Sequence, residues 1–151
     1  MKTGLTEVFG VTKQESAWDQ LVGTIENSFN KQLKQSYSDK SIVKVFYTQN
    51  YGGVAIVTTF SGKIYLDKLA VLPRFRGLGL GKALLARIFE EFPKIVWRAS
   101  YNNPHVTFYY RHCDGLIKSD RWIVFWKNYT LDEIRKTVGP ILDKPSDFAE
   151  D

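Results

Sequence analysis

The sequence predicts an α+β fold in which helices flank a mixed, mostly antiparallel β-sheet. Runs of β-branched and aromatic residues at 42–49, 54–60 and 64–71 are separated by short turns, a pattern typical of an antiparallel meander. An apolar-periodic helix ending at residue 92 then leads to a short strand at 95–98. Strand, helix and strand in this order predict a right-handed crossover between two parallel strands.

Size and composition indicate one packed domain. The chain has 151 residues, of which 44% are hydrophobic and 15% aromatic. A chain of this length buries about two-thirds of the surface that its unfolded form exposes. We therefore expect residues 1–151 to form a single domain with one sheet at its centre.

An amphipathic helix is expected before the meander. Thr12 and Glu15 have the spacing of a capping box, and apolar residues recur at helical spacing through residues 13–29. The polar residues 30–40 predict a short second helix or a loop. Turn-forming residues at 50–53 separate the first two strands of the meander.

The second half of the chain predicts an aromatic helix, a hairpin and a last helix. We expect the aromatic helix at 105–112, the hairpin strands at 116–118 and 122–126, and the last helix at 130–138. A glycine and a proline follow the last helix directly and are expected to end it. The polar tail, residues 143–151, is expected to be loosely ordered.

Charge and cysteine content restrict the classes of ligand. The net charge is +5, from 21 Lys and Arg against 16 Asp and Glu, which suits an anionic partner. The absence of any run of five like charges argues against a nucleic acid or a membrane surface, and favours a small anion. Cys113 is the only cysteine, so we expect neither an internal disulfide nor a zinc-binding cysteine cluster, and no metal site is predicted. No apolar stretch has the length of a membrane span, and no targeting segment is recognisable.

The stretch between residues 76 and 82 is a glycine-rich corner that opens a helix, a combination suited to binding an anion. Its spacing fits neither the G-x-G-x-x-G dinucleotide fingerprint nor a Walker A loop, in which Ala83 would have to be Ser or Thr. Arg76, Gly79 and Gly81 do fit R-x-x-G-x-G, which resembles the acetyl-CoA pyrophosphate loop of the GNAT acetyltransferases. A glycine-rich helix start without any ligand remains the alternative.

Longer strings resemble one GNAT family more specifically, over about residues 42–129. They are YLDKLAV at 65–71, WR at 97–98 before NP at 103–104, FYY at 108–110, DG at 114–115 and VFW at 124–126. These strings resemble the acetyltransferase domain of N-acetylglutamate synthases, in the branch shared by vertebrates, fungi and some bacteria. The resemblance implies the GNAT (acyl-CoA N-acyltransferase) fold. It also implies acetyl transfer from acetyl-CoA to the α-amine of L-glutamate, as in arginine biosynthesis.

The resemblance also implies which residues bind the two substrates. Acetyl-CoA, as a co-substrate, would be held by the backbone of the strand end and of the glycine corner, namely Leu69, Ala70, Val71, Arg76, Gly77, Leu78, Gly79, Leu80, Gly81 and Lys82. Lys68 and Arg98 would bind the carboxylates of glutamate, and Asn103 would contact the same substrate. Each of these three also has an ordinary structural interpretation, as an edge lysine, an internal ion pair and a turn residue.

Tyr109 is the catalytic residue that the resemblance implies, as a donor to the departing CoA thiolate, although core packing is its alternative role. His105 and His112 match no catalytic position of the family and are interpreted as surface or packing residues. One departure is visible, because the family commonly has W-R-S-R where this chain has Trp97 to Ser100 as W-R-A-S. If the missing arginine holds glutamate, the affinity is lower here or the acceptor differs.

Two further functions therefore stay open: a catalytically weak regulatory or structural domain, and a GNAT enzyme with another amine acceptor. The family resemblance implies a preceding amino-acid-kinase domain in the full-length protein, and a homodimer is a further expectation. The expected compartment is the cytoplasm for a bacterial protein and the mitochondrion for a eukaryotic domain.

Overall fold

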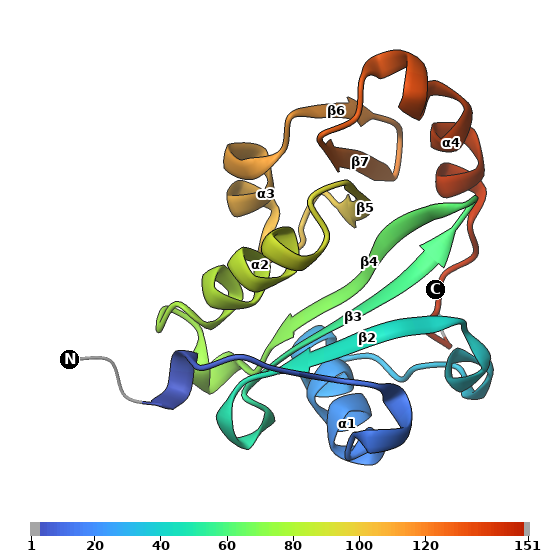
Figure 1. The fold of residues 1–151 in the computed structure, drawn as a ribbon. Coiled ribbons are helices and arrows are strands. Elements are labelled where there is room, and N and C mark those ends of the chain that lie inside the picture. The colour runs from blue at the N-terminus through green and yellow to red at the C-terminus, as the bar shows by residue number, and fades with distance from the viewer. Residues whose placement is uncertain (1–3, 150–151) are drawn as a thin grey trace.

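A seven-stranded sheet forms the centre of the molecule in the computed structural model, which describes residues 4–149 (Figure 1). The strand order is β1-β2-β3-β4-β5-β7-β6. The strands are β1 (Phe9–Val11), β2 (Ile42–Tyr47), β3 (Gly53–Phe60), β4 (Lys63–Val71), β5 (Ile95–Ser100), β6 (Gly115–Lys118) and β7 (Trp122–Lys127).

α-Helices and short 3-10 helices connect these strands. The α-helices are α1 (Trp18–Phe29), α2 (Leu80–Glu91), α3 (Val106–His112) and α4 (Leu131–Asp143). Short 3-10 helices lie at Gly4–Thr6, Lys13–Glu15, Gln35–Asp39, Gln49–Tyr51 and Pro73–Phe75. No helix within residues 4–149 is both long enough and apolar enough to cross a membrane.

The expected parallel pair is present, and it is where the sheet opens. All other neighbouring strands are antiparallel, whereas β4 and β5 are parallel and share only the register pair Tyr65 with Val96. The pairing of β4 with β3 shifts register at Asp67, which is a bulge residue between Leu66 and Lys68. Beyond this bulge β4 and β5 diverge, so one edge of the end of β4 has no strand partner among the described residues.

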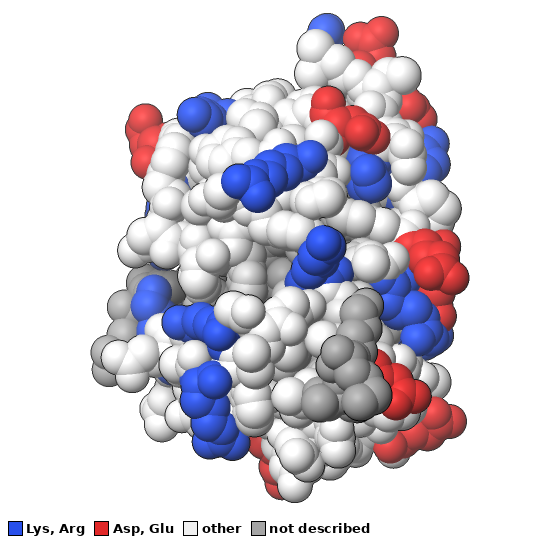
Figure 2. All heavy atoms as spheres, turned by 90° about the vertical axis from the view of Figure 1, so that its left-hand side faces the viewer, with Lys and Arg blue, Asp and Glu red and all other residues white. Residues whose placement is uncertain are grey.

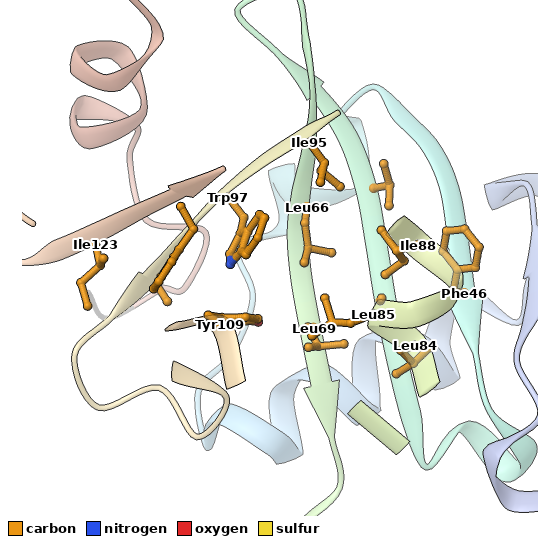
Figure 3. Packing of buried hydrophobic residues seen from close by; sticks show 14 residues of the cluster. Phe46, Leu66, Leu69, Leu84, Leu85, Ile88, Ile95, Trp97, Tyr109 and Ile123 are labelled. Carbon is orange, nitrogen blue, oxygen red and sulfur yellow. The ribbon is translucent and has the colours of Figure 1, made fainter. Parts of the chain in front are cut away.

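Each face of the sheet has its own helices and its own core. On one face α2 and α3 cover a core that includes Leu85, Ile88, Trp97, Tyr109 and Phe125 (Figure 3). On the opposite face α1 covers β2 to β4, and α4 covers β5 and β7. The alternation of side chains along β5 and β7 explains this division, because successive residues of a strand point to opposite faces.

Two helix boundaries differ from the sequence prediction. Residues 13–15 form a 3-10 helix, α1 begins only at Trp18, and the Thr12 side chain makes no capping hydrogen bond, so the predicted capping box there is wrong. The last helix continues beyond residue 138 to Asp143, with Pro140 inside it. Its start is as predicted, with a complete capping box between Thr130 and Glu133.

The tail also differs from the loose order expected for residues 143–151, of which 150–151 lie outside the described part of the chain. Residues 144–149, which we call the strap, run from the end of α4 towards α1 (Figure 1). The Lys34 N–H donates to the Asp147 carbonyl at 2.8 Å, and the Ala149 N–H donates to the Gln32 carbonyl at 2.8 Å. Phe148 is buried against Phe29, with ring centroids 5.2 Å apart.

Candidate functional site

The glycine-rich corner has the backbone conformation that its composition predicts. Gly77 and Gly79 both have φ +86°, in the left-handed region that favours glycine, and Gly79 is the N-cap of α2. The first N–H groups of α2 have no acceptor in the preceding turn and carry the positive end of the helix dipole. The backbone here is therefore arranged to hold an anionic group.

Hydrogen bonds from Arg76 hold this corner in place. Its guanidinium donates to the Val71 carbonyl at 3.2 Å, to the Ser28 carbonyl at 2.9 Å and to Ser28 Oγ at 3.2 Å. These bonds tie the loop before α2 to the end of β4 and to α1. The positive charge of Arg76 stays close to the anion site while its Nε and Nη2 make these bonds.

A cavity of about 230 Å³, the loop cavity, lies against this corner. Its walls come from residues 75–77 and 79–82, from Val71, and from Pro104, His105 and Phe108 in and before α3. Figure 2 shows Lys and Arg side chains beside a hollow on the face at which α2 begins. The cavity has the basic surroundings that a phosphate-bearing ligand requires.

His105 belongs to the loop cavity, although its sequence suggested only surface or packing. A Cβ atom on Gly81 would lie 3.3 Å from both Cε1 and Nδ1 of His105, so the imidazole fits against this glycine. Its Nε2 is buried without a hydrogen-bond partner among the described residues. Burial, with a contribution from the Arg76 charge, lowers the pKa of His105 to about 4. The imidazole is therefore neutral at pH 7.

A second cavity, the central cavity, opens where β4 and β5 diverge and has a volume of about 270 Å³. It brings together the four side chains that the sequence singled out for the acceptor and for catalysis, Lys68, Arg98, Asn103 and Tyr109. The two cavities follow one another along the end of β4, because Leu69 lines the central cavity and Val71 the loop cavity. Likewise the consecutive residues Asn103 and Pro104 line one cavity each.

Lys68 lies in a network of lysines and carboxylates. Its Nζ is 2.7 Å from Asp147 Oδ2 and 3.3 Å from Asp67 Oδ2. Asp67, at the bulge of β4, has a fully buried side chain and also accepts a 2.7 Å hydrogen bond from the Tyr37 hydroxyl. Burial alone would raise the pKa of Asp67, but Lys68, Lys144 and Lys40 outweigh burial and hold the pKa well below its usual range.

Arg98 contacts the end of α4, the strap and β7. Its Nη1 donates to the carbonyls of Ile141 at 2.8 Å and Lys144 at 2.6 Å, and its Nη2 donates to the Pro145 carbonyl at 3.3 Å. Its guanidinium also stacks on Trp122, 3.9 Å from the ring centroid. Arg98 therefore satisfies carbonyls at the end of α4, where the helix has no further backbone donors. Its charge still faces the central cavity.

Tyr109 is 3% exposed, and its ring packs on Trp97 and Phe125 at centroid distances of 5.5 and 5.4 Å. Burial raises the pKa of Tyr109, so its hydroxyl is protonated at neutral pH and is able to donate a hydrogen bond. The indole Nε1 of Trp97 is buried without a partner among residues 4–149, and Figure 3 shows it on the side of the ring towards Tyr109.

Asn103 and Ser100 are engaged in local hydrogen bonds. The Asn103 side-chain oxygen accepts from the His105 N–H at 2.8 Å, which fixes the turn before α3. Ser100 Oγ donates to Asn102 Oδ1 at 2.8 Å. Ser100 thus has a partner of its own, and it adds no positive charge where the family has its second arginine.

The central cavity is basic on balance. It is lined by the cationic side chains of Lys31, Lys68, Arg98, Arg121 and Lys144, against the carboxylates of Asp67 and Asp147. No group of three or more His, Cys, Asp or Glu side chains is arranged to hold a metal ion within the described residues. The cavity therefore suits an acceptor with a net negative charge.

Sequence reasoning missed most of this network. Asp67 belongs to the YLDKLAV string at 65–71, but the sequence does not indicate that it binds Lys68, because nothing in the sequence reveals the bulge. Asp147 and Lys144 were in a polar tail, and Lys40 was in a stretch without periodicity. Only the long-range contacts of the folded chain bring these side chains to Lys68.

Sequence comparisons identify relatives of this chain among acetylglutamate kinases and N-acetylglutamate synthases. An acetylglutamate kinase of Xanthomonas campestris is 38% identical over 122 residues, which are 74% of this chain and 29% of that protein. A mitochondrial N-acetylglutamate synthase of Danio rerio is 35% identical over 125 residues, 79% of this chain and 23% of that protein. The chain thus spans less than a third of the length of these relatives.

The fold has close neighbours among solved structures. A putative GNAT-family acetyltransferase from Bacteroides thetaiotaomicron superposes with a TM-score of 0.65 at 15% sequence identity, covering 87% of this chain and 93% of the other. This confirms the predicted GNAT fold. The family profile described as NAT, N-acetyltransferase, of N-acetylglutamate synthase matches residues 7–144. The chain therefore belongs to the family of N-acetyltransferase domains of N-acetylglutamate synthase.

Proposed function

We propose that this domain transfers the acetyl group of acetyl-CoA to the α-amine of L-glutamate. The observation that carries the proposal is the succession of the central cavity and the loop cavity along the end of β4, where Leu69 lines the first and Val71 the second. A pyrophosphate at the start of α2 would direct the pantetheine arm along the free edge of residues 69–71, as an added strand. The thioester would then reach the central cavity beside Tyr109.

The proposed reaction is a direct transfer in a ternary complex. The neutral amine forms a bond to the thioester carbonyl carbon, and the C–S bond then breaks to release CoA. A backbone N–H at the free edge of β4 would stabilise the oxyanion. The amine loses its proton to water. Holding both substrates in line supplies much of the rate.

The role of Tyr109 follows from its burial. A phenol whose pKa is raised is a poor acid towards a thiolate of pKa about 8.5, so full proton transfer from Tyr109 is unfavourable. A hydrogen bond from its hydroxyl to the developing negative charge on sulfur needs no such transfer. Tyr109 is therefore proposed as a hydrogen-bond donor to the leaving group.

CoA release is the test. It is measured with acetyl-CoA, with and without L-glutamate, for the wild type, Lys68→Met and the control Lys136→Met, whose lysine is exposed on α4. Glutamate-dependent release that Lys68→Met abolishes and Lys136→Met retains supports the proposal. Release that depends on a different amine would instead identify a different acceptor.

One observation favours a catalytically weak domain as the second candidate. Arg98 already donates three hydrogen bonds to carbonyls at the end of α4 and in the strap, and Ser100 replaces the second arginine. Fewer free donors then remain for the glutamate carboxylates. Acetyl-CoA binding by calorimetry without any CoA release, across a set of amines, would support this candidate.

A further inference from the structure

The strap is a fixed wall of the central cavity. Its backbone pairs with residues 32–34 through the Leu33–Phe148 bridge, and Phe148 is 9% exposed in the core under α1. Lys144, Ser146 and Asp147 line the cavity from this wall. The family profile ends at residue 144, so Asp147 lies beyond the part of the chain that the profile matches.

The polar contacts of the strap converge on the two residues proposed to bind the acceptor carboxylates. Asp147 places its carboxylate 2.7 Å from Lys68 Nζ. The strap carbonyls of Lys144 and Pro145 accept hydrogen bonds from Arg98. Asp147 also contacts Lys40 at 2.7 Å and Lys144 at 3.2 Å. Its side chain is 10% exposed, and Lys68 has the same exposure.

Asp147 is chemically equivalent to part of the proposed acceptor. A side-chain carboxylate of an acidic amino acid and the carboxylate of Asp147 are the same group, and both are strong acceptors for an ammonium donor. Lys68 Nζ cannot make its shortest contact, now 2.7 Å to Asp147, with both carboxylates at once. A carboxylate entering the cavity therefore competes with Asp147 for Lys68.

We propose that Asp147 is an internal competitor of the acceptor: it occupies the position at Lys68 that the side-chain carboxylate of the acceptor takes, and so lowers the affinity for dicarboxylic acceptors. This inference rests on the proposed function, because it assumes that Lys68 binds the acceptor. An amino acid with a second carboxylate can displace Asp147 and satisfy Lys68 in its place. An amino acid with an uncharged side chain makes no such exchange, so its binding should not depend on Asp147.

Steady-state kinetics of Asp147→Asn test this role, with KM and kcat measured for L-glutamate and L-glutamine. Asp143→Asn is the matched control, because Asp143 is exposed at the end of α4 and loses the same charge. Without the competing carboxylate, the KM for glutamate should fall roughly threefold to tenfold, up to about 1.4 kcal/mol. We expect kcat, the KM for glutamine and the control to stay unchanged.

Removing Asp147 alone leaves three lysines around Asp67 and could destabilise the fold. The double variant Lys40→Met with Asp147→Asn removes one charge of each sign and keeps the net charge of the network, and Lys40 does not line the central cavity. Thermal unfolding identifies which variant is folded for the kinetics. The same fall in the KM for glutamate is expected in the double variant.

The outcomes separate this inference from the proposed function. Turnover of glutamate with an unchanged or higher KM in the folded Asp147 variants overturns the inference and leaves the proposed function standing. An equal fall in KM for glutamine also overturns it, because the effect would then not depend on the second carboxylate. Absence of glutamate turnover in both the wild type and Asp143→Asn overturns both.

Discussion

Lowering the pH from 7 to 5 should destabilise the fold through one buried imidazole, that of His105. Its pKa is about 4 in the folded chain and 6.5 in the unfolded chain, because burial and the Arg76 charge disfavour the protonated form. Between these two values the unfolded state binds more protons than the folded state. The stability contributed by the neutral imidazole is therefore present above pH 6.5 and is lost as the pH falls towards 4.

The size of the effect follows from proton linkage. With these two pKa values, the free energy of unfolding should fall by about 2 kcal/mol between pH 7 and pH 5 from His105 alone. The carboxylates of Asp67 and Asp147, whose folded pKa values are lowered, lose their contribution only at lower pH. The chosen pH interval therefore isolates the imidazole.

Urea denaturation at pH 7 and pH 5 measures this difference. The wild type, His105→Gln and the control His112→Gln are compared, since His112 is exposed at the end of α3. His105→Gln should lose about 2 kcal/mol of the pH dependence, and His112→Gln should retain it. Equal pH dependence in the wild type and His105→Gln would refute the reasoning, because the imidazole would then titrate alike in both states.

Three other changes have distinct expected results. Tyr109→Phe should lower kcat on the order of a hundredfold with little change in the KM for glutamate, and an unchanged kcat in the CoA-release assay would exclude the hydroxyl from the transition state. Gly79→Ala should cost about 1 kcal/mol of unfolding free energy at φ +86° and weaken acetyl-CoA binding by calorimetry; normal binding would contradict a role for the corner. Thr130→Ala should lose about 1 kcal/mol by removing the capping box with Glu133, with CoA release unaffected, and an unchanged melting temperature would speak against the cap.

The sheet and its crossover could be predicted from the sequence because their signals are local. Alternating β-branched runs, turns and a helix between two strands determine the order of the elements, and connection rules determine their handedness. The structure has β2, β3 and β4 as a meander and β4 and β5 as a parallel pair, as expected. The helix start at Gly79 was also visible, because few other residues adopt its conformation.

The end of α4 could not be predicted in this way. Gly139 and Pro140 are ordinary stop signals, but Val138 and Ile141 on either side of them are buried against β5 and β7. This burial stabilises the helix beyond its local signal, and Pro140 removes only one backbone N–H at an exposed position. Tertiary packing here outweighs local preference, and it carries the chain on to the strap.

The strap explains why the expectation for Arg98 was incomplete. A guanidinium at the end of an apolar strand needs acceptors, and the sequence offered only a substrate carboxylate or an internal ion pair. The structure supplies a third kind of acceptor, the carbonyls at the end of α4 and in the strap. Arg98 then acts on an acceptor mainly through its charge, whereas Lys68 donates hydrogen bonds to two side-chain carboxylates and one backbone carbonyl. Direct recognition of the acceptor therefore depends on whether Lys68 can exchange one carboxylate for another.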